Sequence, residues 1–244
     1  MSRPVDISLV NFPAYPPDEP DRLNKTLERM GYYVDEAAAR GSKLIAFPET
    51  CNYLFSGLGV TAAEPVDGLT LTAMSKKAKQ NNIYIVCPLV LEENSKRYNS
   101  SVLIDRSGKI AGIYHKNFPT QEEMDAGITP GTKTPVFETD FGCIGLCICF
   151  DMNYWEVGAG FAANGAELVI WSSMWPGGRM LTKWAIEFGF NIAACCYDRS
   201  TFMDAAGREI MLAKRNIYDA IGEPASPVDN VTIDMDMRLL HHDY

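Results

Sequence analysis

The sequence predicts an α/β protein with mixed sheets, folded as one domain over residues 1–244. Short apolar runs typical of buried strands alternate with segments whose apolar residues recur at helical spacing. Several strand-like runs are separated only by short turns, and such hairpins favour mixed sheets over a purely parallel one. No linker, repeat or low-complexity tract divides the 27.1 kDa chain, so we expect a single domain.

The first half of the chain shows strands and helices in alternation, followed by a hairpin. Leu27, Met30 and Val34 recur near helical spacing within the first predicted helix. Gly41 then ends that helix. The hairpin turns around Ser107-Gly108. In order, we expect a strand at 5–11, a helix at about 21–40, a strand at 43–47, a helix at about 69–80, a strand at 83–91, and strands at 99–105 and 109–115.

The second half repeats this organisation and adds two hairpins. One hairpin turns near Phe141-Gly142 and the other at Ala206-Gly207. A helix between them ends at Asn164-Gly165. In order, we expect strands at 135–140 and 143–149, a helix at about 154–164, a strand at 167–172, a helix at about 178–190, a strand at 192–197, the second hairpin, and a returning strand at 231–236.

Charge and hydropathy exclude several functional classes. The net charge is −9 and the isoelectric point is near 4.9. Without a basic block, the chain is a poor candidate for binding nucleic acid, because phosphate contacts need clustered Lys and Arg. No apolar run approaches the ~20 residues of a membrane span. The first 20 residues have neither a basic leader nor a long apolar core, so we expect a cytoplasmic protein.

The cysteines and histidines narrow the possible chemistry. We interpret the seven cysteines as mostly buried free thiols in a reducing compartment. Cys143, Cys147 and Cys149 do not predict a zinc site, because no second Cys/His cluster completes the ligand set. His115 is the only histidine away from the C-terminal pair His241-His242. A histidine triad or a metal-dependent amidohydrolase is therefore disfavoured, and we expect no metal and no cofactor.

Three apolar strands end abruptly in a reactive side chain. These residues are Glu49, Lys116 and Cys149. Ligands in α/β sheets bind beyond the carboxyl ends of strands, so the fold can bring the three together. Each alone has a simpler explanation: a loop carboxylate, a solvated lysine, or one more buried thiol.

The flanking residues of these three strand ends match one known arrangement. Together, in this order, they resemble the motifs of the nitrilase superfamily of carbon–nitrogen hydrolases. The matching runs are Phe47-Pro48-Glu49, Tyr114-His115-Lys116, Thr129-Pro130-Gly131 and Ile148-Cys149-Phe150-Asp151. The resemblance covers nearly the whole chain. It departs from the family pattern at Trp155, Trp184 and Phe188, which replace the usual Pro, Arg and Asn.

The resemblance implies a four-layer α-β-β-α sandwich of two mixed sheets and a Glu-Lys-Cys site. Cys149 would be the nucleophile, and Glu49 the general base. Lys116 would favour the thiolate and, with the backbone N–H of Phe150, stabilise an oxyanion. The family also carries a second glutamate between the lysine and the cysteine. Spacing favours Glu123 for it, with Glu122 and Asp125 as alternatives.

The same resemblance implies a hydrolase of non-peptide C–N bonds that passes through a Cys thioester and releases ammonia or an amine. We expect an amidase or N-carbamoyl amidohydrolase that works as a homodimer or larger homo-oligomer. A nitrilase is the enzymatic alternative, and a non-catalytic binding protein on the same fold is another.

Four neighbours of the expected site have lesser roles. Trp175 is expected to wall the substrate pocket, and Arg179 to hold a substrate carboxylate. Arg179 is equally well explained as a solvated residue at a helix start. Asp151 is expected to cap the next helix, and His115 to point away from the site.

Overall fold

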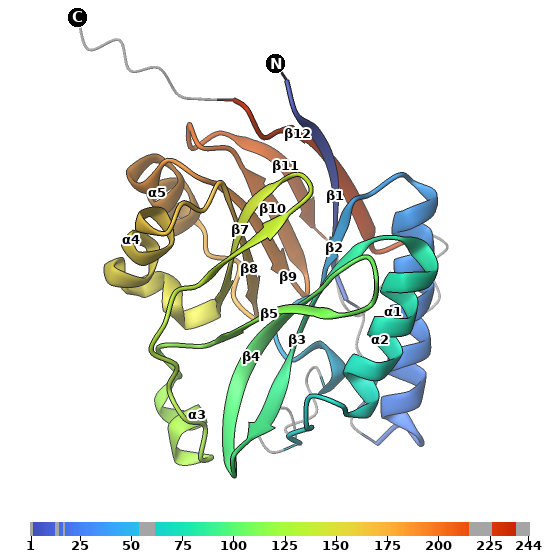
Figure 1. Cartoon of the computed structure of the whole chain (residues 1–244). Coiled ribbons are helices and arrows are strands. Elements are labelled where there is room, and N and C mark those ends of the chain that lie inside the picture. The colour runs from blue at the N-terminus through green and yellow to red at the C-terminus, as the bar shows by residue number, and fades with distance from the viewer. Residues whose placement is uncertain (1, 13–14, 17, 54–61, 215–225, 238–244) are drawn as a thin grey trace, which may run out of the picture.

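Two six-stranded mixed sheets pack face to face, and a pair of helices covers each outer face (Figure 1). The computed structural model describes residues 2–12, 15–16, 18–53, 62–214 and 226–237. His241 and His242 lie outside the described residues. The four-layer α-β-β-α order implied by the sequence resemblance is confirmed. No helix among the described residues has the length and apolar character needed to cross a membrane.

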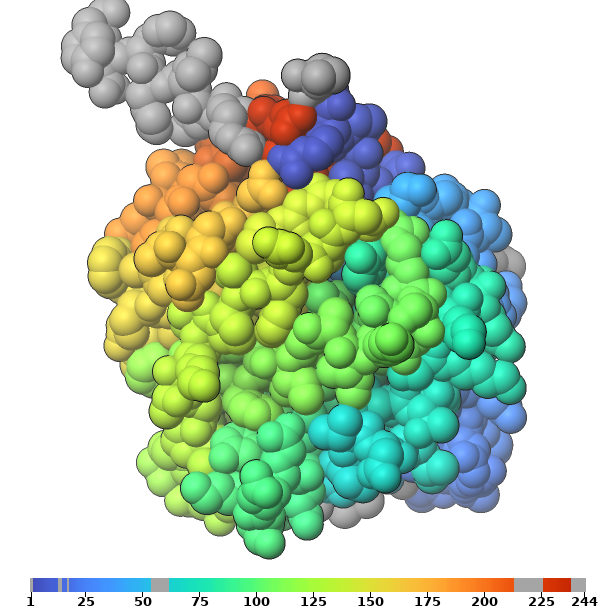
Figure 2. Space-filling view, viewed as in Figure 1, coloured from blue at the N-terminus to red at the C-terminus, as the bar shows by residue number. Residues whose placement is uncertain are grey.

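The first sheet combines three parallel strands with an antiparallel hairpin and an antiparallel edge strand. Helices α1 (Arg22–Ala39) and α2 (Leu69–Asn81) connect the parallel strands, as such crossovers require. The last strand returns beside the first, blue against red in Figure 2. In spatial order the strands are β12 (Val228–Asp234), β1 (Pro4–Val10), β2 (Leu44–Ala46), β3 (Tyr84–Glu93), β4 (Lys96–Ile104) and β5 (Ile110–His115).

The second sheet has the same plan. Its three central strands run parallel through α4 (Trp155–Ala163) and α5 (Arg179–Phe188), and the outer strands pair antiparallel. In spatial order the strands are β11 (Glu209–Lys214), β10 (Arg199–Met203), β9 (Asn191–Cys196), β8 (Leu168–Ser173), β7 (Gly142–Ile148) and β6 (Val136–Thr139). The two hairpins predicted in this half are therefore confirmed.

The main core lies between the two sheets. Ile7 and Val86 from the first sheet and Leu146 and Ile170 from the second belong to one cluster of fully buried side chains. Hydrogen bonds also cross this interface: the Ser172 hydroxyl donates to the Phe47 carbonyl at 2.9 Å. This contact holds the end of β2 against the end of β8, which places the residues after both strands close together.

The structure differs from the sequence prediction at two places. A short helix α3 (Gln121–Asp125) forms where the sequence suggested only an acidic loop. A reciprocal capping box between Thr120 and Glu123 closes this helix at its N-terminus. Cys149 does not continue β7 but begins a 3₁₀ turn, Cys149–Asn153. Both differences involve residues of the expected site.

The inter-sheet core should dominate stability. We expect Leu146→Ala to lower the free energy of unfolding by about 2–5 kcal/mol, because the fully buried side chain leaves a cavity that neighbours fill only in part. Urea denaturation measures the change. Leu69→Ala is the matched control: its side chain is 63% exposed, so its effect should stay within about 0.5 kcal/mol. Equal losses in both variants would contradict this assignment of the core.

Candidate active site

A buried lysine at the carboxyl end of β5 lies between two buried carboxylates. One follows the carboxyl end of β2, and the other is on α3. Lys116 follows β5 directly, and Glu49 follows β2 by three residues. The Lys116 Nζ donates to Glu49 Oε1 at 2.8 Å and to Glu123 Oε2 at 2.7 Å. The Lys116 side chain is only 1% exposed. The structure thus brings together three of the four residues expected to be catalytic, and it selects Glu123 over the exposed Glu122 and Asp125.

Asn99 on β4 completes this cluster, and the sequence analysis missed it. Its Nδ2 donates to Glu49 Oε1 at 2.8 Å and to Glu123 Oε1 at 2.6 Å, so it bridges the carboxylates beside Lys116. Its Oδ1 is buried without a hydrogen-bond partner among the described residues. The available signal was a polar residue inside an otherwise apolar buried strand, since such a residue needs partners.

Charge sets the protonation state of this cluster. Burial acts to lower the pKa of Lys116, but Glu49, Glu123 and Cys149 together raise it above its usual range. Burial likewise acts to raise the pKa of Glu123, and Lys116 reverses this, so the pKa is lowered. Lys116 is therefore an ammonium and Glu123 a carboxylate at neutral pH.

Cys149 occupies a strained turn directly after β7. Its φ of 39° lies in the left-handed region, which costs a non-glycine residue about 1–3 kcal/mol. The Trp171 indole N–H donates to the Cys149 carbonyl at 3.1 Å and helps to hold this conformation. The Cys149 thiol interacts with the Ser173 side chain and the Met174 N–H, so it lies at the carboxyl end of β8.

The pKa of the Cys149 thiol lies above its usual range. Burial, the largest influence, and the charge of Glu49 raise its pKa to about 12. Lys116, the Ser173 side chain and the Met174 backbone N–H act in the opposite direction. Lys116 thus favours the thiolate, as expected, but it is outweighed. The Met174 N–H also donates to Glu49 Oε2 at 3.2 Å, so thiol and carboxylate share one neighbour.

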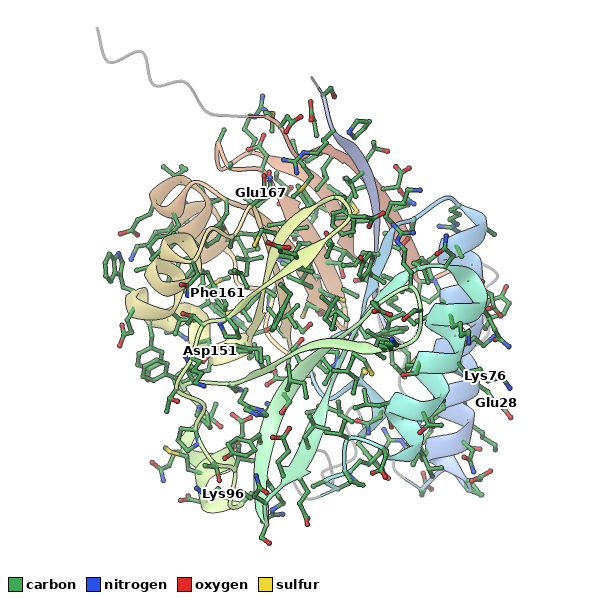
Figure 3. The ribbon with its side chains drawn as sticks, viewed as in Figure 1. Glu28, Lys76, Lys96, Asp151, Phe161 and Glu167 are labelled. Atoms are coloured by element: carbon green, nitrogen blue, oxygen red, sulfur yellow. The ribbon has the colours of Figure 1, made fainter. Side chains whose placement is uncertain are left out.

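The prediction that Asp151 caps the next helix is wrong, because the N-cap residue of α4 is Tyr154. Asp151 is labelled in Figure 3. Its carboxylate accepts from the Tyr114 hydroxyl at 2.7 Å, the Phe118 N–H at 2.8 Å and the Ile148 N–H at 3.3 Å. It therefore ties the residues around Lys116 to the turn of Cys149. Burial raises its pKa to about 6, although these donors and Lys116 oppose the rise.

The remaining expected site residues lie at the surface near this cluster or away from it. Phe150 is 36% exposed, and its N–H lies in the first turn of the 3₁₀ segment, where no intrahelical acceptor exists. Trp175 is 39% exposed and packs edge-on against Trp171. Arg179 lines a separate depression of about 370 Å³ beside Arg199, so its binding of a substrate carboxylate stays a prediction.

His115 points away from the site, as predicted. Its ring stacks on Tyr98 at 4.2 Å between centroids, and its Nδ1 lies 2.8 Å from the Ser100 hydroxyl. Because successive residues of a strand face opposite sides, Lys116 turns inward. The described residues contain no cluster of three or more His, Cys, Asp or Glu side chains that could hold a metal ion.

Comparison with known proteins supports the assignment that the motifs suggested. A model of the carbon-nitrogen hydrolase family matches residues 13–198, about three quarters of the chain. The chain belongs to this family. The matched span contains all the residues of the cluster around Lys116, together with Cys149. Motifs, fold and family model therefore agree on the nitrilase superfamily.

Among relatives of this chain, a probable nitrilase of Schizosaccharomyces pombe is 30% identical over 163 residues (63% of this chain, 59% of that protein). A human omega-amidase is 28% identical over 160 residues, which are 62% of this chain and 56% of that protein. A beta-ureidopropionase of Arabidopsis thaliana is 28% identical over 200 residues, which are 76% of this chain and 49% of that protein. The matches thus span about half to three fifths of these relatives. An amidase of Nesterenkonia sp. has the same fold, with a TM-score of 0.79 at 22% identity over 96% of this chain and 90% of that one.

Glu49 and Lys116 should move the pKa of Cys149 in opposite directions. Glu49→Gln removes a negative charge that opposes the thiolate, so the pKa should fall below its value of about 12. Lys116→Met removes a favourable cation, so the pKa should rise. The pH dependence of Cys149 alkylation by iodoacetamide, followed by peptide mapping, measures both. Shifts in the same direction would contradict the geometry described for the site.

Proposed function

We propose that this protein hydrolyses a non-peptide C–N bond of a small amide or N-carbamoyl compound through a Cys149 thioester. The observation that carries this proposal is the buried Glu49–Lys116–Glu123 cluster beside a strained cysteine. Such an arrangement supplies a nucleophile, a base and a fixed positive charge within one site.

Acylation requires that the thiol lose its proton as it attacks. Because the pKa of Cys149 is about 12, a resting thiolate is scarce at neutral pH, and Glu49 takes the proton while the S–C bond forms. The carbonyl oxygen becomes an oxyanion, which the Lys116 ammonium and the Phe150 N–H stabilise. The C–N bond then breaks, and Glu49 returns the proton to the leaving ammonia or amine.

Deacylation uses the same groups. Glu49 takes a proton from water as the oxygen attacks the thioester carbon, and the proton goes back to the Cys149 sulfur as the S–C bond breaks. Glu123 does not touch the reacting atoms in this scheme. It accepts from Lys116, Asn99 and the Thr120 N–H, so it is a positioning residue that fixes the ammonium.

The proposed class of substrate is based on the similar proteins named above. An omega-amidase and a beta-ureidopropionase are among them, which supports amide and carbamoyl substrates. The resemblance to a probable nitrilase supports a nitrile as the alternative, since its attack by a thiol also leads to a thioester. A non-catalytic protein on this fold is disfavoured, because the cluster and Cys149 are all present.

Homodimerisation and a cytoplasmic location also remain proposals. The outer helices α4 and α5 expose Trp155 (56%) and Ile186 (48%), and large apolar side chains of this kind are typical of surfaces that pack against another copy. The mostly buried free thiols are those expected in a reducing compartment.

Ammonia release tests the proposed reaction directly. The wild-type protein should release ammonia from at least one member of a panel of amides, N-carbamoyl amino acids, carbamoyl amines and nitriles. Cys149→Ala should lose at least about a thousandfold in kcat/KM, since it removes the nucleophile. Cys143→Ala, a change at another partly buried thiol, should retain activity. Turnover that survives Cys149→Ala would refute the thioester route.

The two neighbouring glutamates should differ in their contribution. Glu123→Gln should lower kcat by about 10–100-fold with little change in KM, because a displaced Lys116 stabilises the oxyanion poorly. Glu122→Gln is the matched control: its side chain is exposed, and its activity should equal that of wild type. Steady-state kinetics and the melting temperature of both variants separate this effect from loss of fold. A normal Glu123→Gln enzyme would remove Glu123 from the site.

A further inference from the structure

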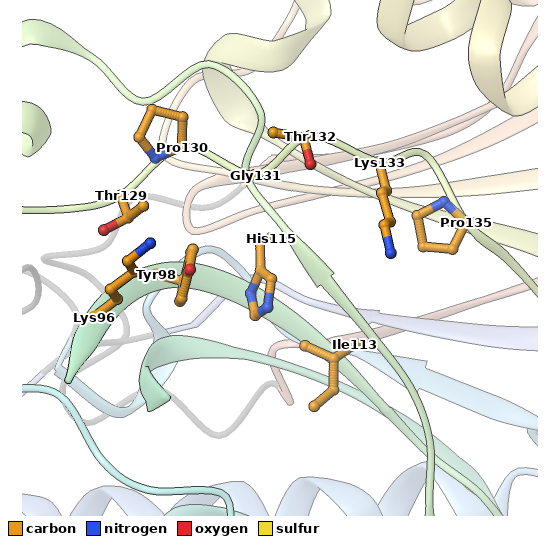
Figure 4. A pocket seen from close by; sticks show the side chains of 10 residues that line it. All are labelled: Lys96, Tyr98, Ile113, His115, Thr129, Pro130, Gly131, Thr132, Lys133 and Pro135. Carbon is orange, nitrogen blue, oxygen red and sulfur yellow. The ribbon is translucent and has the colours of Figure 1, made fainter. Parts of the chain in front are cut away.

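A second pocket lies on the outer face of β4 and β5, opposite the side to which Lys116 points. It encloses about 390 Å³ between these strands and the segment 129–135 (Figure 4). Its ten lining residues include no aspartate or glutamate, and none of Glu49, Glu123 and Cys149. It is therefore separate from the candidate active site and has no role in the mechanism above.

The polar groups of this pocket are suited to a negative charge. Figure 4 shows the ammonium ends of Lys96 and Lys133 on either side of the His115 ring. Neither lysine forms an ion pair with a described residue. The hydroxyl-bearing Thr129 and Thr132 contribute to the same wall. Both lysines are exposed, and they face the same pocket in a chain of net charge −9.

The pocket also has rigid and apolar parts. Tyr98 and His115 stack, and the contact of Nδ1 with the Ser100 hydroxyl fixes the histidine ring. The Glu93 carboxylate lies 3.6 Å from His115 Nε2 but is not part of the lining. Ile113 and Pro135 add apolar surface. A small ligand would thus meet a stacked aromatic pair with a lysine on either side.

We propose that this pocket binds a small oxyanion, of the class of phosphate or a phosphate monoester, between Lys96 and Lys133. A doubly charged, compact oxyanion accepts charge-assisted hydrogen bonds from ammonium groups and further hydrogen bonds from threonine hydroxyls, and this lining supplies both kinds of donor. A singly charged ion such as chloride cannot make as many charge-assisted hydrogen bonds. The site is not assigned by the proposed hydrolysis and does not depend on it.

The pocket is joined to the backbone of Lys116. The Gly131 N–H, in the pocket wall, donates to the Lys116 carbonyl at 2.8 Å, and the Lys116 N–H donates to the Asn99 carbonyl at 2.8 Å. A bound oxyanion would draw the segment 129–135 toward β4, where Lys96 begins the strand. The ligand would therefore stabilise the segment that contacts the main chain of Lys116, and we expect it to raise the melting temperature.

Isothermal titration with inorganic phosphate, at constant ionic strength set by chloride, tests the site without any substrate. The wild-type chain should show saturable binding at one site, and Lys96→Ala/Lys133→Ala should bind at least about tenfold more weakly. The matched control is Lys43→Ala/Lys109→Ala, which removes the same charge from exposed lysines outside the pocket. This control should bind phosphate as wild type does.

Two results would overturn the proposal. One is the absence of saturation by about 10 mM phosphate in the wild-type chain. The other is equal weakening in both double variants, which would show a general charge effect. Melting temperatures of both double variants without phosphate verify that they remain folded. Because binding is measured directly, its failure leaves the hydrolase proposal intact, and inactivity toward the substrate panel leaves the oxyanion site intact.

Discussion

The buried ammonium of Lys116 is the constraint on which the site depends. A charge that is 1% exposed is strongly destabilising unless other charges and hydrogen bonds compensate it. Glu49 and Glu123 supply that compensation, and Asn99 bridges them. Burial of Lys116 therefore requires three parts of the chain to meet: Glu49, Asn99 and the segment 116–123. The site is thus assembled only when the chain is folded.

This compensation has a consequence for the nucleophile. Two carboxylates around one ammonium leave the cluster with an excess negative charge, and a thiolate would add to it. The pKa of Cys149 is raised first by burial and then by the charge of Glu49. The arrangement favours a thiol that loses its proton only during attack, with Glu49 close enough to share the Met174 N–H. The base is thus as necessary as the nucleophile.

Strand alternation gives β5 and the residue after it two distinct faces. Tyr114 and Lys116 point inward, where Tyr114 reaches Asp151 and so joins the lysine segment to the Cys149 turn. His115, between them, points outward to the second pocket. The same three backbone residues, 114–116, therefore contribute side chains to the candidate active site on one face and to the second pocket on the other.

The sequence by itself determined the alternation of strands and helices, the hairpins, and the strand ends at which Glu49, Lys116 and Cys149 occur. These features are local, because apolar periodicity and turn residues act over a few positions. Within the described residues, the strand pairs and helices followed that pattern closely. The short helix α3 was missed, since five residues carry too little periodicity to be recognised.

Only the tertiary structure decided which residues complete the site. Spacing alone left Glu122, Glu123 and Asp125 open, and the capping box at Thr120 turns Glu123 inward. Asn99, the contacts of Asp151 and the raised pKa of Cys149 all depend on distances between segments far apart in the chain. Electrostatic and hydrogen-bond energies depend on separation in space and on burial, and neither quantity can be read from positions along the sequence.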